Sequence, residues 1–387
     1  MHALRAAIIG PGFVGRAHLE ALRRQGIDIH GILASSPQRT AEACVNLGLT
    51  HGYHSIDELV ADKAVDVVHI CTPNYLHFEQ ARTVLAAGKH VMCEKPLAMD
   101  TRESATLVEL AKGSGCVGGV AYNLRFYPLC QEAHSMVAHG LIGEPCLIHG
   151  SFLQDWLLYP TDWNWRLDTK LGGDLRAIAD IGTHWLDLLT WISGKKISEV
   201  CADLATIVPV RRRPRGRVET FQRTEGAFDE VKVSSEDYGA VLLHFEGDAR
   251  GVMTVSQVSA GRKTRLWFEI DGSAGSLAWN SESPNTLWIG KRHSPNQELA
   301  KDPTLMTPEA RGYAAYPGGH PEGYPDTFAR LFEDFYEYLA AGDLKKRRSF
   351  PTFETGHEEL VLCEAIALSA RERRWVSVAK KHVSTHS

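Results

Sequence analysis

The chain has 387 residues, of which 44% are hydrophobic and 23% charged, and its formal net charge is −5 at pH 7. This length predicts two domains, and the composition is typical of a globular protein, which excludes a disordered or fibrous chain. The negative charge gives no reason to expect nucleic acid as a partner. Because no apolar run approaches the roughly 18 residues that a membrane-spanning helix needs, we expect no membrane partner either.

The eight cysteines form no C-x-x-C pair and show no spacing typical of a zinc finger. The N-terminus lacks the long apolar segment of a signal peptide. We therefore expect a reducing compartment, the cytoplasm, and no bound metal. The one basic cluster, residues 211–217, is short and contains a proline, so we interpret it as a solvated loop.

Residues 4–9 form a short apolar run of strand type, and G-P-G-F-V-G follows at residues 10–15, before an amphipathic helix. In this G-x-G-x-x-G pattern, Gly10 permits a tight turn, Gly12 lets the backbone approach a pyrophosphate, and Gly15 lets the helix pack on the strand. The N-terminus of the helix also favours phosphate. We therefore predict a dinucleotide site here. The residues expected to contribute to it are Gly10, Gly12, Phe13, Val14 and Gly15.

The second strand, predicted over 29–34, should end near the residue that recognises the ribose of the adenosine. Sites selective for NAD commonly place Asp or Glu there. This chain has Ser35, Ser36 and Arg39 instead, and their hydroxyl and guanidinium groups could bind a 2′-phosphate. The cofactor is therefore expected to be NAD or NADP, with a slight preference for NADP. The alternative is that Arg39 merely lies on the surface of the following helix.

Strands and helices continue to alternate up to residue 122, which predicts a parallel sheet with ligands at the carboxyl ends of its strands. Two loops at those ends carry polar residues. One contains Thr72, Pro73, Asn74 and His77, and the other contains Glu94, Lys95 and Pro96. Lys95 should lie where the nicotinamide half of a dinucleotide binds, and the Lys95–Pro96 bond is a candidate cis peptide. A Glu-Lys-Pro loop can also be a simple surface turn.

Asp180 and His184 are four residues apart, so a helix that begins near Asp180 would place both side chains on one face. The flexible pair Gly172-Gly173 precedes them, and the apolar residues from Trp185 onward predict a buried helix. A carboxylate and an imidazole in this position suit proton transfer. A capping Asp and a hydrogen-bonded core His would give the same pattern.

Beyond residue 240 the apolar pattern changes to period two, which is typical of antiparallel strands. Strands are predicted over 240–245, 251–258, 264–271, 276–280 and 286–289. Residues 281–325 are rich in Pro and Gly and are expected to contain a long loop, and helices over 326–341 and 354–370 close the chain. The aromatic residues between 156 and 165 suit the apolar face of a sugar ring, although core packing could also account for them.

In this order, these motifs resemble the Gfo/Idh/MocA family, the glucose–fructose oxidoreductase and inositol dehydrogenase type of pyranose and cyclitol dehydrogenases. The matching segments are G-x-G-x-x-G at 10–15, T-P-N-x-x-H at 72–77, E-K-P at 94–96, N-L-R-F at 123–126, W-R at 165–166, G-G at 172–173 and D-x-G-x-H-x-x-D at 180–187. Residues 153–156 look closest to levoglucosan dehydrogenase and other glucoside 3-dehydrogenases. Residues 34–39 are instead similar to those of reductases that prefer NADP.

The resemblance implies an α/β protein with a Rossmann domain over 1–122 and a substrate-binding domain over 123–387. The second domain would contain a large, open, mostly antiparallel sheet, whose uncovered face favours a homodimer or homotetramer. It also implies that Lys95, Asp180 and His184 are catalytic, and that Trp165 and Arg166 lie beside the nicotinamide. The remaining residues expected to contact the cofactor are Thr72, Pro73, Asn74, His77 and Glu94.

Oxidation of a secondary alcohol in a sugar or cyclitol needs a hydride acceptor and a base. We expect His184 to be the base, Lys95 to hydrogen-bond the reacting hydroxyl, and Asp180 to orient Lys95 or a neighbouring hydroxyl. Lys95 as the base is an alternative. The residues expected to bind substrate are Asn123, Arg125, Gln154, Asp155 and His184.

Two other functions are compatible with parts of this pattern. A metal-assisted dehydrogenase could use Asp180 and His184 as ligands, but no third ligand is evident. A cofactor-binding sensor that has lost catalysis would be expected to lack the lysine or the histidine, and both are present.

Overall fold

In the computed structural model we describe residues 4–216 and 227–378. The chain forms two compact units. The first contains Met1–Asn123 and Tyr324–Leu360, and the second contains Leu124–Gly323 and Val361–Ser387. The sequence boundary at 122/123 assigned residues 324–360 to the second domain, whereas the structure places them in the first unit. The reason is local packing, because α9 (Tyr324–Ala341) lies along α1 (Phe13–Arg24) and the side chain of Gln25 donates to the carbonyl of Ala329.

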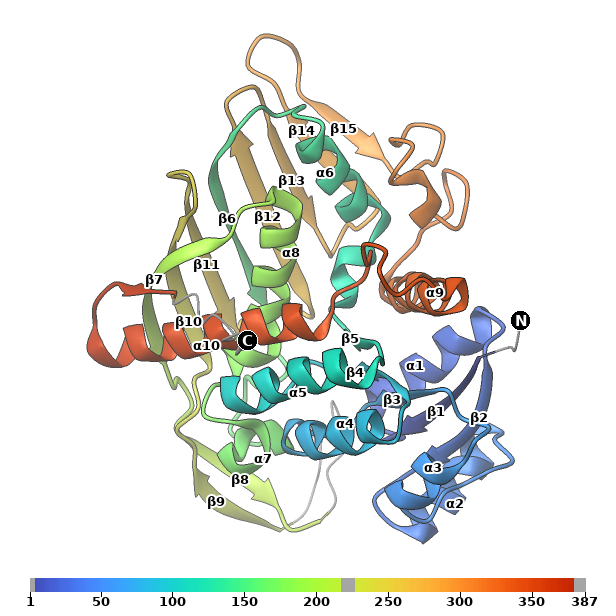
Figure 1. The fold of residues 1–387 in the computed structure, drawn as a ribbon. Coiled ribbons are helices and arrows are strands. Elements are labelled where there is room, and N and C mark those ends of the chain that lie inside the picture. The colour runs from blue at the N-terminus through green and yellow to red at the C-terminus, as the bar shows by residue number, and fades with distance from the viewer. Residues whose placement is uncertain (1–3, 217–226, 379–387) are drawn as a thin grey trace, which may run out of the picture. The chain divides into compact units, whose positions relative to one another are not determined.

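The described part of the first unit is built on a parallel sheet with the strand order β2-β1-β3-β4-β5 (Figure 1). The strands are β1 (Arg5–Ile9), β2 (Asp28–Leu33), β3 (Val67–Ile70), β4 (His90–Cys93) and β5 (Gly118–Val120). The other helices are α2 (Pro37–Leu47), α3 (Ile56–Ala61), α4 (His77–Ala86) and α5 (Thr101–Ser114), with a 3-10 turn η1 (Asn74–Leu76). Central strands such as β3 are buried throughout, which explains their continuous apolar sequence.

The described part of the second unit contains a nine-stranded sheet with the order β15-β14-β13-β12-β6-β11-β10-β7-β16 and a separate β8-β9 hairpin (Figure 1). The strands are β6 (Pro145–Leu153), β7 (Ile197–Ala205), β8 (Val210–Pro214), β9 (Phe228–Lys232), β10 (Tyr238–Phe245), β11 (Arg250–Ser256), β12 (Arg265–Gly272), β13 (Ser276–Asn280), β14 (Thr286–Gly290), β15 (Gln297–Ala300) and β16 (Val376–Ser377). Neighbouring strands pair antiparallel except β6 and β11, which pair parallel.

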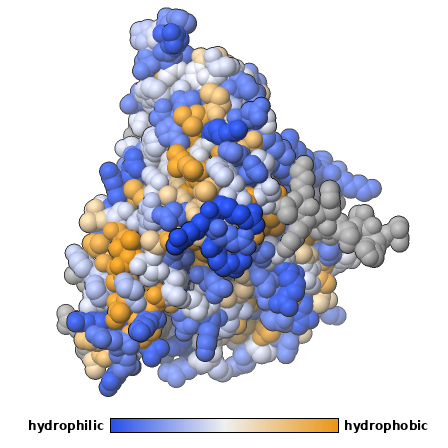
Figure 2. All heavy atoms as spheres, turned by 90° about the vertical axis from the view of Figure 1, so that its left-hand side faces the viewer, coloured by the Kyte–Doolittle hydropathy of each residue, from blue (hydrophilic) through white to orange (hydrophobic). Residues whose placement is uncertain are grey.

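Two helices of the second unit, α6 (Pro128–Ala138) and α8 (Thr183–Ser193), pack on this sheet. Burial alternates along the strands, as in β10, where Val241 and Leu243 are buried and Leu242 is 50% exposed. The sheet therefore buries one face and leaves parts of the other uncovered. Apolar side chains also reach the molecular surface in patches, as Figure 2 shows for one face of the molecule.

The α/β class predicted from the sequence is confirmed, with an N-terminal parallel sheet and a large, mostly antiparallel sheet after it. The remaining helical elements are η2 (Asn123–Phe126), η3 (Trp165–Leu167), α7 (Thr169–Gly172), η5 (Arg311–Tyr313) and α10 (Phe353–Glu372), which begins in the first unit and ends in the second. Across residues 4–216 and 227–378, every helix is too short or too polar to cross a bilayer.

The interpretation of residues 211–217 as a solvated loop is wrong for its first part. Arg211 lies on β8 and is fully buried, where it forms an ion pair with Asp237. A guanidinium that is paired with a carboxylate can be buried, because the ion pair offsets the cost of desolvation. The local sequence does not indicate such a partner. Residue 217 lies outside the described residues.

Candidate active site

The three glycines of residues 10–15 differ in what surrounds them. Gly10 has a φ of +97°, and a Cβ there would lie 2.6 Å from the carbonyl oxygen of Cys71. A Cβ on Gly15 would lie 2.0 Å from the carbonyl oxygen of Gly10, so this glycine is needed for packing. A Cβ on Gly12 would meet no protein atom within 4 Å. Gly12 therefore borders open space at the point where α1 begins.

Gly12 is also the N-cap residue of α1, and among the described residues no side chain caps this helix. A helix N-terminus presents backbone N–H groups and partial positive charge, which suit phosphate. A glycine with open space beside it, at an end without a capping side chain, fits the pyrophosphate of a dinucleotide. Of the predicted residues, Gly12 and Phe13 are exposed and Val14 is half-buried at this end of α1, whereas Gly15 is buried against the backbone of Gly10.

Ser35, Ser36 and Arg39 lie together after β2. The hydroxyl of Ser36 accepts the backbone N–H of Arg39 and caps α2, while Nη1 of Arg39 donates to Oγ of Ser35 at 2.9 Å. Ser36 therefore has a structural role that its sequence position alone did not reveal. Arg39 and Ser35 are the pair that could meet a phosphate on the adenosine ribose.

His77 connects the two predicted loops of the first unit. Its Nδ1 lies 2.7 Å from the carbonyl oxygen of Pro96, and its Nε2 lies 2.8 Å from the carbonyl oxygen of Thr72. The ring is fully buried, and burial lowers the pKa of His77. Because both nitrogens face backbone oxygens, His77 is suited to holding the loops in place, and direct cofactor contact, as we predicted for it, is disfavoured.

The loop after β4 places Lys95 next to a buried carboxylate. Oε2 of Glu94 accepts the backbone N–H of Lys95 at 3.2 Å, and Oε1 lies 3.1 Å from Nε2 of His18. The Lys95–Pro96 peptide bond is cis. In the neighbouring loop, the hydroxyl of Thr72 donates to Gln80 and Asn74 is buried. His18 was not among the residues singled out from the sequence, although a histidine on the buried face of an amphipathic helix could have indicated it.

In the second unit, Asp180 lies in a π-helical turn (Ile178–Gly182) that runs directly into α8, so the predicted regular helix around Asp180 is replaced by a wider turn. Such turns are frequent at functional sites. Nε of Arg166 donates to Oδ1 of Asp180 at 3.0 Å, and Nε2 of Gln257 donates to Oδ2 at 2.9 Å. Both oxygens of the carboxylate are thereby held.

Arg166 also contacts Trp165, another residue predicted from the sequence. The guanidinium of Arg166 lies over the ring of Trp165, 4.4 Å from its centroid, and its Nη1 donates to Oδ1 of Asn164. Trp165, Arg166 and Asp180 therefore form one cluster within the second unit. His184 lies on the first turn of α8, half-buried, with its ring 6.3 Å from that of Phe152.

The orientation of the Gln257 amide is decided by its other neighbour. Nη1 of Arg176 donates to Oε1 of Gln257 at 3.3 Å. An arginine can only donate hydrogen bonds, so the amide oxygen must face Arg176 and the amide NH₂ must face Asp180. Gln257 is fully buried and was missed by the sequence analysis. It lies just after β11, and no motif there indicates its partner.

Arg176 belongs to a buried cluster in which two arginines meet two carboxylates. Arg176 and Arg211 both donate to Oδ1 of Asp237. Glu236 accepts the backbone N–H groups of Arg176 and Ile178, although burial raises the pKa of its carboxyl. The formal charges balance, which makes burial of the cluster tolerable. Its effect is to anchor the start of the turn that carries Asp180.

Besides His184, four residues were predicted to bind substrate, and each forms hydrogen bonds or ion pairs with other side chains or backbone groups of the protein. Asn123, in the first unit, donates to the hydroxyl of Thr327. Arg125 forms a two-bond ion pair with Asp187 in the second unit. Oε1 of Gln154 accepts the indole N–H of Trp156. Asp155 accepts from the backbone of Gly261 and from Lys263. These contacts favour structural roles for Asn123 and Arg125, whereas the contact of Gln154 uses only its amide oxygen.

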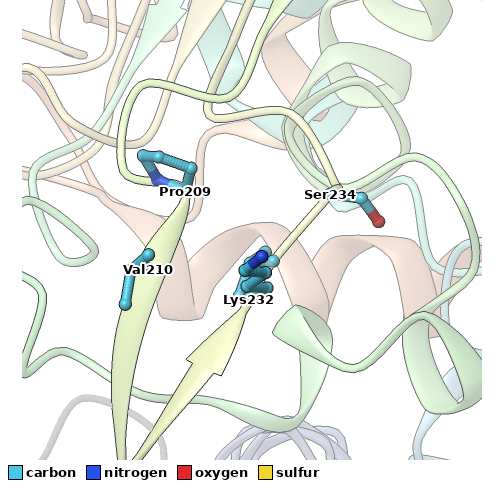
Figure 3. A pocket seen from close by; sticks show the side chains of 5 residues that line it. Pro209, Val210, Lys232 and Ser234 are labelled. Carbon is cyan, nitrogen blue, oxygen red and sulfur yellow. The ribbon is translucent and has the colours of Figure 1, made fainter.

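Two other features of the second unit are formed by other residues. A hollow of about 470 Å³ beside the β8-β9 hairpin is lined by Pro209, Val210, Lys232, Val233 and Ser234 (Figure 3). In the described part of the chain, three potential metal-binding side chains come within 4.8 Å of one another on the β6-β12 surface, namely His149, Glu269 and Asp271. Neither feature contains a predicted catalytic residue.

Comparison with known proteins supplies the context for this geometry. The sequence profile described as "Oxidoreductase family, NAD-binding Rossmann fold" matches residues 4–122, and that of the "GFO/IDH/MocA C-terminal domain" matches residues 130–278. The levoglucosan dehydrogenase of Pseudarthrobacter phenanthrenivorans is 30% identical over 394 residues, with 98% of this chain and 99% of that protein covered.

Two solved structures are similar over nearly the whole chain. A levoglucosan dehydrogenase in complex with NADH and levoglucosan has a TM-score of 0.87 at 28% identity, with 97% of this chain and 100% of that chain covered. An inositol dehydrogenase homologue from Azotobacter vinelandii, complexed with NAD⁺, has a TM-score of 0.86 at 28% identity, with 97% of each chain covered.

Proposed function

The chain belongs to the GFO/IDH/MocA family of NAD-binding oxidoreductases, and on this premise we propose that it is an NAD(P)-dependent dehydrogenase of a pyranose sugar, a sugar derivative or a cyclitol. The proposed reaction moves a hydride between a secondary alcohol of the substrate and the nicotinamide. The domains proposed for it are 1–122 for the cofactor and 123–387 for the substrate, except that residues 324–360 belong to the first compact unit. We further propose a cytoplasmic homodimer or homotetramer joined through the uncovered sheet face.

The observation that carries this proposal is the binding of Asp180 by Arg166 and Gln257, with Trp165 beside it and His184 one turn further on. A carboxylate with both oxygens held by donors keeps one orientation, and such donors favour its charged form. It is suited to orienting a lysine or a substrate hydroxyl, and less suited to accepting the proton itself. His184, in the next turn, is the residue that we assign as base.

The remaining roles follow from the chemistry of an alcohol. Lys95 donates a hydrogen bond to the reacting hydroxyl and so stabilises negative charge that develops on its oxygen. His184 takes the proton of that hydroxyl. Residues 10–15 and the start of α1 hold the pyrophosphate, with Thr72, Pro73, Asn74 and Glu94 nearby in the same unit. When bound, the nicotinamide supplies the acceptor for the hydride.

For the cofactor we propose a slight preference for NADP over NAD. The support is the paired side chains of Ser35 and Arg39 at the end of β2, where a carboxylate would repel a 2′-phosphate. The solved relatives described above hold NADH or NAD⁺, so the preference is a property of this chain to be measured.

A substrate screen tests the proposal directly. NAD and NADP are each combined with levoglucosan, glucose, glucosides, disaccharides and inositols, and formation of the reduced nicotinamide is followed by its near-ultraviolet absorbance. We expect turnover with at least one sugar or cyclitol. Tight binding of the cofactor with no turnover on the whole panel would support a cofactor-binding sensor instead. Full activity in EDTA would exclude a metal-assisted mechanism.

A further inference from the structure

Four buried polar side chains of the first unit form a continuous line that ends at Glu94. Nε2 of His69 lies 3.0 Å from the hydroxyl of Tyr336, and Nδ1 of His69 lies 3.0 Å from Nδ1 of His18. Nε2 of His18 lies 3.1 Å from Oε1 of Glu94. Both histidines are 0% exposed, and Tyr336 and Glu94 are 5% and 8% exposed. The line joins α9, β3, α1 and the loop after β4.

The surroundings of this line are apolar. The ring of His18 packs against Phe328 and Phe332 of α9, with centroids 5.2 and 4.7 Å apart, and the ring of His69 also contacts Phe332. A buried polar atom without a hydrogen-bond partner destabilises the folded state. Each ring nitrogen in the line is therefore expected to form a hydrogen bond, either as a donor or as an acceptor.

The direction can be derived from the chemistry of the ends. A carboxylate only accepts hydrogen bonds, so Nε2 of His18 donates to Glu94. With one proton on its ring, His18 then accepts at Nδ1 and Nδ1 of His69 donates, whereas a second proton on His18 would reverse the bond between the two rings. Burial lowers the pKa of His69 well below its ordinary value, which keeps this ring neutral. Nε2 of His69 therefore accepts, and the hydroxyl of Tyr336 donates.

We propose that His18, His69 and Tyr336 are positioning residues that hold the Glu94-Lys95 loop through a one-way hydrogen-bond chain from Tyr336 to His69, His18 and Glu94. Each neutral imidazole in this order has one donor and one acceptor, and every nitrogen is used once. The second oxygen of Glu94 accepts the backbone N–H of Lys95, so the chain fixes the residue that presents the amine. The importance of Lys95 for turnover rests on the proposed function, whereas the hydrogen-bond chain does not.

The first test is the tautomeric state of the two histidines, measured by nitrogen NMR on protein with labelled imidazoles at neutral pH. We expect His18 to carry its proton on Nε2 and His69 on Nδ1. Tyr336→Phe should disturb the His69 nitrogens while the Nε2 proton of His18 persists. Tyr338→Phe is the matched control, because its hydroxyl lies on the same helix and donates to the carbonyl of Leu344. A proton on Nδ1 of His18, in a neutral or a doubly protonated ring, or a doubly protonated His69 would overturn the proposal.

The second test measures how firmly Lys95 is held, by hydrogen exchange of its backbone N–H. His18→Leu should speed this exchange at least about 10-fold relative to the N–H of Val91, which donates within the sheet of the same unit. His18→Gln should restore most of the protection, because a carboxamide also has one donor and one acceptor. Equal exchange in wild type and His18→Leu would contradict the proposal, whether or not the protein turns over a sugar.

Turnover then separates this inference from the proposed function. If the protein is a dehydrogenase, His18→Leu should lower kcat about 10- to 100-fold with little change in the affinity for cofactor, and His18→Gln should recover much of it. Wild-type protein without turnover, but with the expected tautomers and exchange, would overturn only the proposed function. Unchanged kcat in His18→Leu would show that the chain does not position Lys95 for catalysis.

Discussion

Nε2 of Gln257 donates to Oδ2 of Asp180 at 2.9 Å, and the amide cannot be turned round because Arg176 occupies its other side. Asp180 is therefore oriented by two residues: the fully buried Gln257 binds one carboxylate oxygen, and Arg166 binds the other. The buried cluster of two arginines and two carboxylates keeps Gln257 in this orientation. The orientation of Asp180 is therefore determined by residues that are not themselves assigned to substrate binding.

Removal of the Gln257 amide should loosen Asp180. Gln257→Leu is expected to lower kcat about 10- to 100-fold, because one carboxylate oxygen loses its donor, and Gln257→Glu should lower it further by placing like charges side by side. Gln131→Leu is the control, since that buried amide donates to the backbone carbonyl of Arg125 and not to Asp180. Steady-state kinetics and thermal unfolding distinguish the two variants. Equal losses of kcat in Gln257→Leu and the control would argue against a role for the contact.

Lys95→Ala and His184→Ala should each reduce turnover by about 10²-fold or more while nearly preserving affinity for the cofactor. The reason is that both side chains are assigned to the reacting hydroxyl, and the cofactor is held mainly by residues 10–15. Lys89→Ala provides a comparison, because this buried lysine donates to the carbonyls of Asp62 and Val65 and should affect stability more than kcat. Wild-type kcat in either of the first two variants would refute the assignment.

Two glycine substitutions should separate folding from cofactor binding. Gly15→Ala is expected to destabilise the first unit by at least about 1–3 kcal/mol, since its Cβ would lie 2.0 Å from a backbone oxygen. Gly12→Ala should leave the melting temperature nearly unchanged and weaken cofactor binding, because its Cβ projects into open space. Thermal unfolding and fluorescence titration of the cofactor measure the two effects. Unweakened binding in Gly12→Ala would show that no phosphate approaches this residue.

Arg39→Ala should weaken NADP binding about 10-fold and leave NAD binding nearly unchanged, because only NADP carries the 2′-phosphate that Arg39 could pair with. Arg102→Ala, on the exposed surface of α5, is a control for the loss of one positive charge. Titration of each variant with both cofactors provides the comparison. Parallel changes for NADP and NAD would mean that Arg39 does not recognise the 2′-phosphate.

Acid should destabilise the first unit through its buried histidines. Burial lowers the pKa of His69 in the folded state, whereas the unfolded chain protonates near pH ~6.5. Because the unfolded state then binds more protons, the contribution of His69 to stability is complete above about pH 6.5 and is lost progressively as the pH falls toward the folded-state pKa. Denaturant unfolding of wild type and His69→Gln at several pH values measures this. The variant should lose less stability on acidification, and His293→Gln, at an exposed position, should behave as wild type.

Local sequence patterns were sufficient to predict most of the helices and strands and the loop at residues 10–15. The continuous apolar runs of β1 and β3, the period-two pattern of β10, and the G-x-G-x-x-G at residues 10–15 each reflect constraints that act within a few residues. The strands β7, β8, β9, β15 and β16 were missed, because their sequences alternate weakly or are short and their pairing depends on a neighbouring strand. The family resemblance added the expectation of two sheets, which the structure bears out.

The sequence by itself therefore determined the α/β class, the dinucleotide loop and the identity of the polar residues at Glu94-Lys95 and Asp180. Only the tertiary structure decided which groups hold them. Gln257 donates to Asp180, and His18, itself in contact with His69, lies next to Glu94. His77 lies between two loops, and Arg211 forms a buried ion pair with Asp237. Such partners lie far apart in the chain, up to 267 residues between His69 and Tyr336. The periodicity of apolar residues indicates which side of a helix or strand is buried. A hydrogen bond between distant segments depends on how the helices and strands pack together.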